Sequence, residues 1–263
     1  MRLLLDIGNT RIKWALQRAG AGQAEFLIWG DLLRTNPSDE VVSNLCAAVG
    51  EALASKAGDS DVGLTRVAAV NVGGKPFGSA LAAGLQAHFG LSPLFIKSQS
   101  EAFGLRNGYV DISQLGVDRW VAMLAVAEPD GRDCCIVDAG TAVTIDYVDA
   151  GLVHQGGIIF PGLHLMRHAL FAGTGDIENF AIQAAAPENV ALLGKATDAA
   201  VRFGALQATV GAVQRVMDSG SATCRLVVTG GDAPQLLPLL ANYNPDYRPL
   251  LVLEGVSRLA GAA

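Results

Sequence analysis

Long apolar runs are missing from this sequence. No run approaches the roughly 18 residues that a membrane-spanning helix needs. The apolar stretch after Arg2 ends at Asp6, which is too early for a secretory signal. We therefore expect no membrane association and a cytoplasmic protein.

Basic residues are not in excess, and the cysteines are not paired in sequence. A net charge of -6 gives no general electrostatic reason to bind nucleic acid, which usually requires a basic stripe. The cysteines show no CxxC pair, which favours buried, reduced thiols over a metal or disulfide site: Cys46, Cys134, Cys135 and Cys224. His164 and His168 are four residues apart, but no glutamate follows His164, so the HExxH zinc signature is absent.

Apolar and glycine residues are abundant. Hydrophobic residues make up 51% of the 263 residues and charged residues 17%, and 31 residues are glycine. This composition provides ample surface for burial and many positions for tight turns. A compact α/β protein is therefore expected rather than a disordered chain.

The order of apolar patterns predicts two similar halves. In the first half we expect strands at 2–7, 11–17, 25–30, 67–72 and 94–96, with helical patterns at 41–53 and 81–89. In the second half we expect strands at 134–137, 143–148, 153–159, 226–229 and 250–253, and a long helix at 197–217. A helix at 115–126 connects them. Each half thus follows a βββαβαβ-type plan.

An internal repeat supports this division. A shift of 132 positions places Asp6 on Asp138 and Gly8 on Gly140, each after an apolar strand. We predict one domain at residues 1–115 and a second at 116–263 that includes the connecting helix. No linker rich in proline or serine separates them, so we expect a cleft between packed halves.

The first copy of the repeat reads D-x-G-N-T-x-x-K from Asp6 to Lys13. Asp6 ends a strand and is available to hold Mg²⁺ through water, and Gly8 permits close approach of the backbone to a ligand. The hydrogen-bonding groups of Asn9 and Thr10 and the charge of Lys13 suit phosphate. An ordinary β-turn with an exposed lysine is the alternative.

The second copy and a later turn offer related chemistry. Asp138 supplies an oxygen ligand for a cation, and Thr141 is placed to contact phosphate. Near the C-terminus, Gly230 and Gly231 directly follow a strand, which suits close backbone approach to a ligand, although a simple tight turn has the same pattern.

A third candidate site lies at Asp118 and Arg119. Adjacent residues on a helix point in different directions, so a simple ion pair is not expected. Asp118 is suited to accept a proton from a substrate hydroxyl, and Arg119 to bind an anionic group. The alternative is a solvated pair on a helix surface.

Taken together, these motifs resemble the type III pantothenate kinases, a family that also includes the Bvg accessory factor proteins. The resemblance extends almost from end to end, through DIGNTRIK, NGY with LGVDRW, DAGTAVTID, GGIIFPG, GKAT and TGGDA. It implies two ribonuclease-H-like domains of the acetate and sugar kinase, Hsp70 and actin superfamily. It also implies transfer of phosphate from ATP to the hydroxyl of pantothenate, the first step of coenzyme A biosynthesis.

The resemblance implies specific roles for residues. Those expected to bind ATP, with Mg²⁺, are Asp6, Ile7, Gly8, Asn9, Thr10, Arg11, Ile12, Lys13 and Thr141. Those expected to contact pantothenate are Tyr109, Gly116, Val117, Asp118, Arg119 and Thr197, with Asp118 as general base. Asp138 is expected to bind a monovalent cation, K⁺ or NH₄⁺. The family is dimeric, so a homodimer is expected.

One departure and two alternatives stay open. Family members commonly carry proline three residues after the tyrosine, where this chain has Ile112; loss of proline loosens a loop and affects affinity more than chemistry. The alternatives are another small-molecule kinase of the superfamily and a regulatory accessory protein that keeps the fold. Intact acidic and phosphate-binding residues argue against the second.

Overall fold

The computed structural model describes residues 1–20, 25–35, 38–56, 63–173 and 192–262. These residues form two compact units. The first comprises Met1–Phe103, Tyr109–Ala127 and Leu250–Ala263, and the second comprises Gly104–Gly108 and Glu128–Pro249. The domain boundary between residues 115 and 116 stays a prediction; the compact units group the helix after it, and the C-terminal helix, with the first half.

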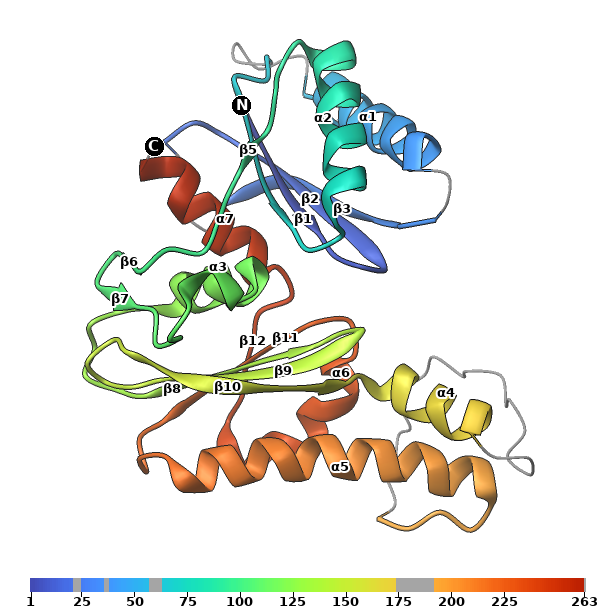
Figure 1. Cartoon of the computed structure of the whole chain (residues 1–263), viewed down its shortest axis with the longest axis vertical. Coiled ribbons are helices and arrows are strands. Elements are labelled where there is room, and N and C mark those ends of the chain that lie inside the picture. The colour runs from blue at the N-terminus through green and yellow to red at the C-terminus, as the bar shows by residue number, and fades with distance from the viewer. Residues whose placement is uncertain (21–24, 36–37, 57–62, 174–191, 263) are drawn as a thin grey trace. The chain divides into compact units, whose positions relative to one another are not determined.

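A five-stranded mixed sheet forms the centre of the first unit. Its spatial order is β3-β2-β1-β4-β5 (Figure 1). The strands are β1 (Arg2–Ile7), β2 (Arg11–Gln17), β3 (Phe26–Leu33), β4 (Arg66–Asn71) and β5 (Leu94–Phe95). The first three pair antiparallel, whereas β4 runs parallel to β1 and to β5. Because β1 lies in the middle, its apolar side chains are buried on both faces.

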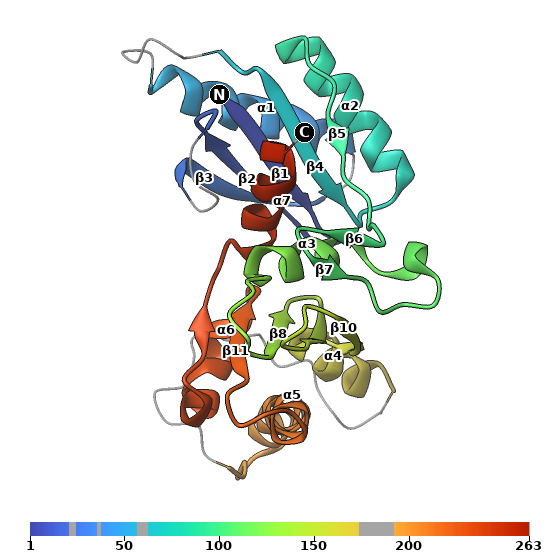
Figure 2. The same ribbon diagram turned by 90° about the vertical axis from the view of Figure 1, so that its left-hand side faces the viewer.

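Helices cover both faces of this first sheet. On one side, α1 (Ser38–Ala54) and α2 (Lys75–Phe89) pack against β1, β2 and β4 through a shared apolar core. On the other side lie α7 (Leu251–Ala262) and α3 (Val117–Val126), which are neighbours in both views (Figures 1 and 2). α2 ends where Gly90 adopts φ 67° and its N–H bonds to Gln86. The 3₁₀ helix η1 (Ile112–Gln114) precedes α3, and the two-residue strand β6 (Glu101–Ala102) lies before it.

The second unit repeats this strand arrangement. Its sheet has the order β10-β9-β8-β11-β12. The strands are β8 (Cys134–Ala139), β9 (Ala142–Val148), β10 (His154–Pro161), β11 (Arg225–Thr229) and β12 (Asp246–Tyr247), and the short β7 (Leu105–Arg106) also belongs to this unit. The helical elements are α4 (Leu163–Gly173), α5 (Thr197–Ser219), α6 (Ala233–Leu236) and η2 (Leu237–Tyr243). α5 supplies much of the apolar core beneath the sheet.

The two sheets therefore share one topology. In each, three antiparallel strands are followed by a helical segment, a parallel strand, a second helical segment and an edge strand. This confirms the duplicated α/β plan predicted from the sequence. Among the described residues, no helix combines the length and the apolar character needed to cross a membrane.

One predicted element was wrong. Residues 250–253 were expected to form the last strand, but from Leu251 they form the first turn of α7, and the edge strand is Asp246–Tyr247. The run Leu251–Leu253 is buried on all sides, so its apolar residues do not alternate. A short continuous apolar run has the same appearance in a buried helix and in a buried strand.

Close contact between α3 and α7 depends on a glycine. A Cβ atom added at Gly255 of α7 would lie 1.9 Å from the backbone oxygen of Val121 in α3. Nearby, Arg258 donates to the backbone oxygens of Leu124 and Ala127 and thereby caps the C-terminal end of α3. The helices thus approach closely enough to form side-chain-to-backbone bonds.

We predict that Gly255→Ala lowers the free energy of unfolding by about 1–3 kcal/mol, because the added methyl group must push the two helices apart. Urea unfolding followed by circular dichroism measures this change. Gly50→Ala in α1 is the matched control, since a Cβ there meets nothing within 4 Å and alanine favours a helix. Equal stability of Gly255→Ala and the wild type would contradict the packing described.

Candidate active site

The first candidate element is the turn between β1 and β2. The strands stay paired as far as Ile7 and Ile12, and the turn closes with a hydrogen bond from Gly8 N to Arg11 O of 2.9 Å. Asn9, Thr10 and Arg11 are exposed. The predicted phosphate-binding residues therefore lie in an exposed hairpin whose flanking strands are fixed in the core.

Charged side chains form a row across the strands beside this turn. Asp6 of β1 lies opposite Lys13 of β2, and Lys13 lies opposite Asp31 of β3. Side chains at such paired positions share one face of the sheet. Arg11, two residues before Lys13, forms an ion pair with Asp31. Positive and negative charges thus alternate along the edge where the hairpin begins.

The loop from β4 to α2 meets the same edge of the first sheet. β1 and β4 are parallel and in register, with Ile7 opposite Asn71, so their carboxyl ends coincide. The side chain of Asn71 holds the loop, since its oxygen accepts from Gly73 N at 2.9 Å and its nitrogen donates to Gly74 O at 3.0 Å. This structure is an Asx-type turn that leads into a helix.

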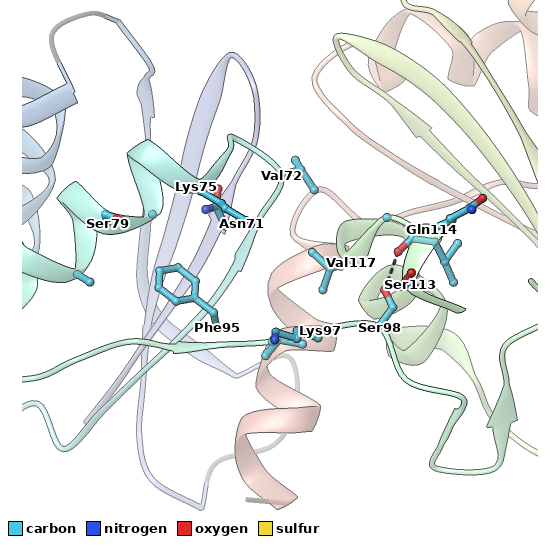
Figure 3. Close-up of a pocket in the computed structure, with 15 residues that line it drawn as sticks. Asn71, Val72, Lys75, Ser79, Phe95, Lys97, Ser98, Ser113, Gln114 and Val117 are labelled. Carbon is cyan, nitrogen blue, oxygen red and sulfur yellow. Dashed lines mark hydrogen bonds between the residues drawn. The ribbon is translucent and has the colours of Figure 1, made fainter. Parts of the chain in front are cut away.

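A cavity of about 740 Å³ lies beside this loop, within the first unit. Residues 71–72, one face of α2, residues 95–98 and residues 113–117 line it (Figure 3). On α2 the lining includes the small residues Gly78 and Ala82, which leave space for the cavity. On the opposite side, Ser98 Oγ donates a hydrogen bond of 2.8 Å to Leu115 O and so joins two of the lining segments. Its volume lies in the range of small-molecule pockets.

The charge of this cavity is positive. Lys75 and Lys97 line it, and among the residues that the structure describes no aspartate or glutamate does. Within the described part of the chain, neither lysine has a carboxylate within ion-pairing distance. Two uncompensated ammonium groups in a protein of net charge -6 favour an anionic ligand.

The predicted substrate residues are partly brought together beside this cavity. Gly116 and Val117 line it, and Asp118 follows them in the first turn of α3. The Asp118 carboxylate turns back over Gly116, where a Cβ atom would lie only 2.7 Å from Oδ1. The same oxygen accepts from Arg119 N at 2.9 Å. Asp118 as a whole residue is half-buried.

Arg119 and Tyr109 form a second group of the predicted residues. Arg119 is buried, at 5% exposure, and its Nη1 donates to Tyr109 Oη at 2.8 Å. The guanidinium also lies 5.5 Å from the centre of the tyrosine ring. Arg119 therefore points to a different side of α3 from the half-buried Asp118. Ile112, the first residue of η1 between Tyr109 and α3, is exposed.

In the second unit, the hairpin after β8 holds Asp138 and Thr141. Asp138 pairs with Thr229 at the end of β11, so the turn that contains Gly230 lies directly beside it. Gly230 has φ 96°, and a Cβ atom there would lie 2.3 Å from Ala139 O, so only glycine fits. The bond from Asp232 N to Ala139 O, 2.9 Å long, joins the two turns.

Asp232, in the turn that follows β11, has an environment that disfavours ionisation of its carboxyl group. Burial raises the pKa of Asp232 above its ordinary value, while His164 acts in the opposite direction. His164 and His168 lie on α4 with their rings stacked at 6.0 Å.

Thr197 is exposed at the first position of α5, in this second unit.

The amino-acid sequence matches known kinases over most of its length. Residues 2–219 match the family model described as type III pantothenate kinase. A type III pantothenate kinase of Nitrosococcus oceani is 35% identical over 99% of this chain and 94% of its own. Another, of Aromatoleum aromaticum, is 38% identical over 91% of this chain and 90% of its own.

The chain belongs to the type III pantothenate kinase family. Its activity is ATP-dependent phosphorylation of pantothenate in coenzyme A biosynthesis, a phosphotransferase reaction, as the sequence predicted. Kinases of this family require ATP and a divalent metal.

Solved structures support the fold assignment. A putative Baf family transcriptional activator from Campylobacter jejuni superposes with a TM-score of 0.57 and 19% identity, covering 99% of this chain and 98% of that chain. An activator of 2-hydroxyisocaproyl-CoA dehydratase from Clostridium difficile, with bound ADPNP, gives 0.51 and 11% identity, covering 99% and 94%. At these identities the likeness concerns the fold alone.

The donor groups of this kinase fit the metals and nucleotide that the family implies. Asp6 and Asp138 present half-buried carboxylates at the ends of β1 and β8, and carboxylate oxygen is a preferred ligand of Mg²⁺ and of other hard cations. A divalent ion held by Asp6 would neutralise charge on bound phosphates. The four cysteines are free thiols, as expected, although Cys224 is only half-buried. Burial raises the pKa of Cys134 to about 12.

Several residues of the site carried no recognisable signal in the sequence. Lys75 and Lys97 are far apart in the chain, and only the fold places both at one cavity. Arg34 directly follows β3 and donates to a backbone oxygen of the turn between β1 and β2. The Gly-Gly pair before Lys75 is the one clue that a search for phosphate-binding loops would have found.

Proposed function

We propose that Asp118 is the general base of the kinase and accepts the proton of the pantothenate hydroxyl as the γ-phosphoryl group of ATP is transferred. Its position supports this role, because Asp118 directly follows Gly116 and Val117, which line the cationic cavity, and the residue is only half-buried. Phosphoryl transfer passes through a loose transition state, so the hydroxyl proton leaves late and orientation matters more than a strong base.

Residues 6–13 bind the phosphates of ATP in this proposal. The exposed turn offers backbone N–H groups and the hydrogen-bonding side chains of Asn9 and Thr10, while Lys13 contributes positive charge. Thr141 of the second hairpin also contacts ATP. Asp6 holds Mg²⁺ through water, and Asp138 binds the monovalent cation, K⁺ or NH₄⁺.

The cavity of the first unit takes pantothenate, which carries a carboxylate at one end and a primary hydroxyl at the other. Lys75 and Lys97 give the cavity the charge that attracts an acid. Tyr109, Arg119 and Thr197 are the further residues proposed to contact pantothenate. Residues 1–115 and 116–263 act as the two domains, and the enzyme works as a homodimer.

The decisive experiment is an assay of ADP release with purified full-length protein, ATP, Mg²⁺ and pantothenate, with and without K⁺. We expect release that depends on pantothenate and rises at least tenfold when K⁺ or NH₄⁺ replaces Na⁺. A panel of other small alcohols serves as the control for substrate class. Equal rates with every alcohol would reject pantothenate, and equal rates in Na⁺ would reject the cation.

For Asp118→Asn, we predict a fall in kcat of at least about 100-fold, the usual contribution of a general base. Binding of a non-hydrolysable ATP analogue, measured by calorimetry, should be unchanged, because Asp118 does not contact the nucleotide in this proposal. Asp130→Asn is the matched control, since Asp130 pairs with Arg132 on the surface of the second unit. Normal turnover in Asp118→Asn would remove this residue from the mechanism.

The two lysines generate a prediction about substrate charge. We expect Lys97→Met and Lys75→Met each to raise KM for pantothenate about five- to tenfold, with KM for neutral panthenol changed less than twofold. Steady-state kinetics with both alcohols measures the difference, and added salt should reduce it because mobile ions screen exposed charges. If KM rises equally for pantothenate and for panthenol, the lysines support the structure of the cavity but do not recognise the carboxylate.

A further inference from the structure

One arginine outside the predicted motifs joins two loops at the edge of the first sheet. Arg34 follows β3, and its Nη1 donates to Gly8 O at 3.1 Å and, at a longer 3.5 Å, to Asn9 O. Its Nη2 donates to Gly73 O at 2.6 Å. A single guanidinium therefore bonds the turn between β1 and β2 and the loop between β4 and α2.

The shape of the loop fits this guanidinium closely. A Cβ atom at Gly73 would lie 2.4 Å from Arg34 Nη1, so a side chain there would displace it. Arg34 also lies over the ring of buried Phe77, with Cζ 4.8 Å from its centre. The backbone of Arg34 is held too, because its N–H donates to Thr10 O at 2.8 Å. The side chain is thus fixed in one place.

Peptide geometry converts these bonds into an orientation of the turn. In a trans peptide group the C=O and the following N–H point in opposite directions. When Arg34 holds the oxygens of Gly8 and Asn9, the N–H groups of Asn9 and Thr10 must point away from it. The same argument directs the N–H of Gly74, because Arg34 holds the oxygen of Gly73. Successive N–H groups oriented in this way are suited to bind anions.

We propose that Arg34 is a positioning residue for nucleotide binding, which orients the N–H groups of residues 9, 10 and 74 toward the phosphates of ATP. The inference rests on the proposed role of residues 6–13. It adds the loop before α2 to the phosphate-binding surface and explains the glycine at position 73. In this proposal Arg34 does not contact the phosphates itself, because its guanidinium donates to backbone oxygens of the two loops.

The test is the affinity for the Mg²⁺ complex of a non-hydrolysable ATP analogue, measured by calorimetry without pantothenate, together with steady-state kinetics. We expect Arg34→Met to weaken binding of the analogue and raise KM for ATP at least tenfold. kcat at saturating ATP should change less than threefold, and KM for pantothenate should stay the same. Gly73→Ala should show the same pattern, because its methyl group displaces the guanidinium.

Two comparisons separate orientation from charge and from unfolding. Arg34→Lys keeps the positive charge but loses the planar fork, so it should not restore ATP affinity. Arg132→Met, which loses only the bonds to Asp130, is the matched control and should bind the analogue normally. The melting temperature of each variant shows whether it is folded.

Unchanged analogue affinity in folded Arg34→Met, or full restoration by lysine, would overturn the proposal. These outcomes are independent of the acceptor substrate. If the wild-type protein bound the analogue but did not phosphorylate pantothenate, the proposed function would be rejected. The affinities of the Arg34 variants for the analogue would still test whether Arg34 positions the nucleotide-binding loops.

Discussion

Parallel pairing of β1 with β4 is the constraint on which the candidate site depends. With Ile7 opposite Asn71, the two strands end at the same level, so the turn after β1 and the loop after β4 emerge side by side. β8 and β11 repeat this arrangement, with Asp138 opposite Thr229. In each unit the candidate residues thus lie where a hairpin and a strand-to-helix loop meet.

Hydrogen bonds to backbone groups fix the loops at these meeting points. Asn71 and Arg34 bond to peptide groups of the loops, and Gly230 lets one turn pass within contact distance of another. Side chains then add charge, from Lys13 on the hairpin and from the two lysines of the cavity.

The sequence predicted best where a local pattern has a single physical meaning. The bounds of β1 and β2 agree with the structure because apolar residues end at the turn residues Gly8 and Asn9. The run at 251–253 failed because it has no alternation to reveal its state. The contacts of Arg34 were not predicted, because its hydrogen bonds go to backbone carbonyl oxygens, which every residue type has. The cavity was not predicted, because Lys75 and Lys97 are distant in the sequence and come together only in the folded chain. The roles of Asp118 and Asp138 stay predictions.

The turns of the two hairpins differ in length, although the sheets around them do not. Residues 8–11 separate the last strand pair in the first unit, but only residues 140–142 do so in the second. In each hairpin the ladder, the buried side chains and a turn of its own length together set the register. The two units therefore differ in the turns that carry the candidate ligand-binding residues, while the sheets around these turns keep one topology.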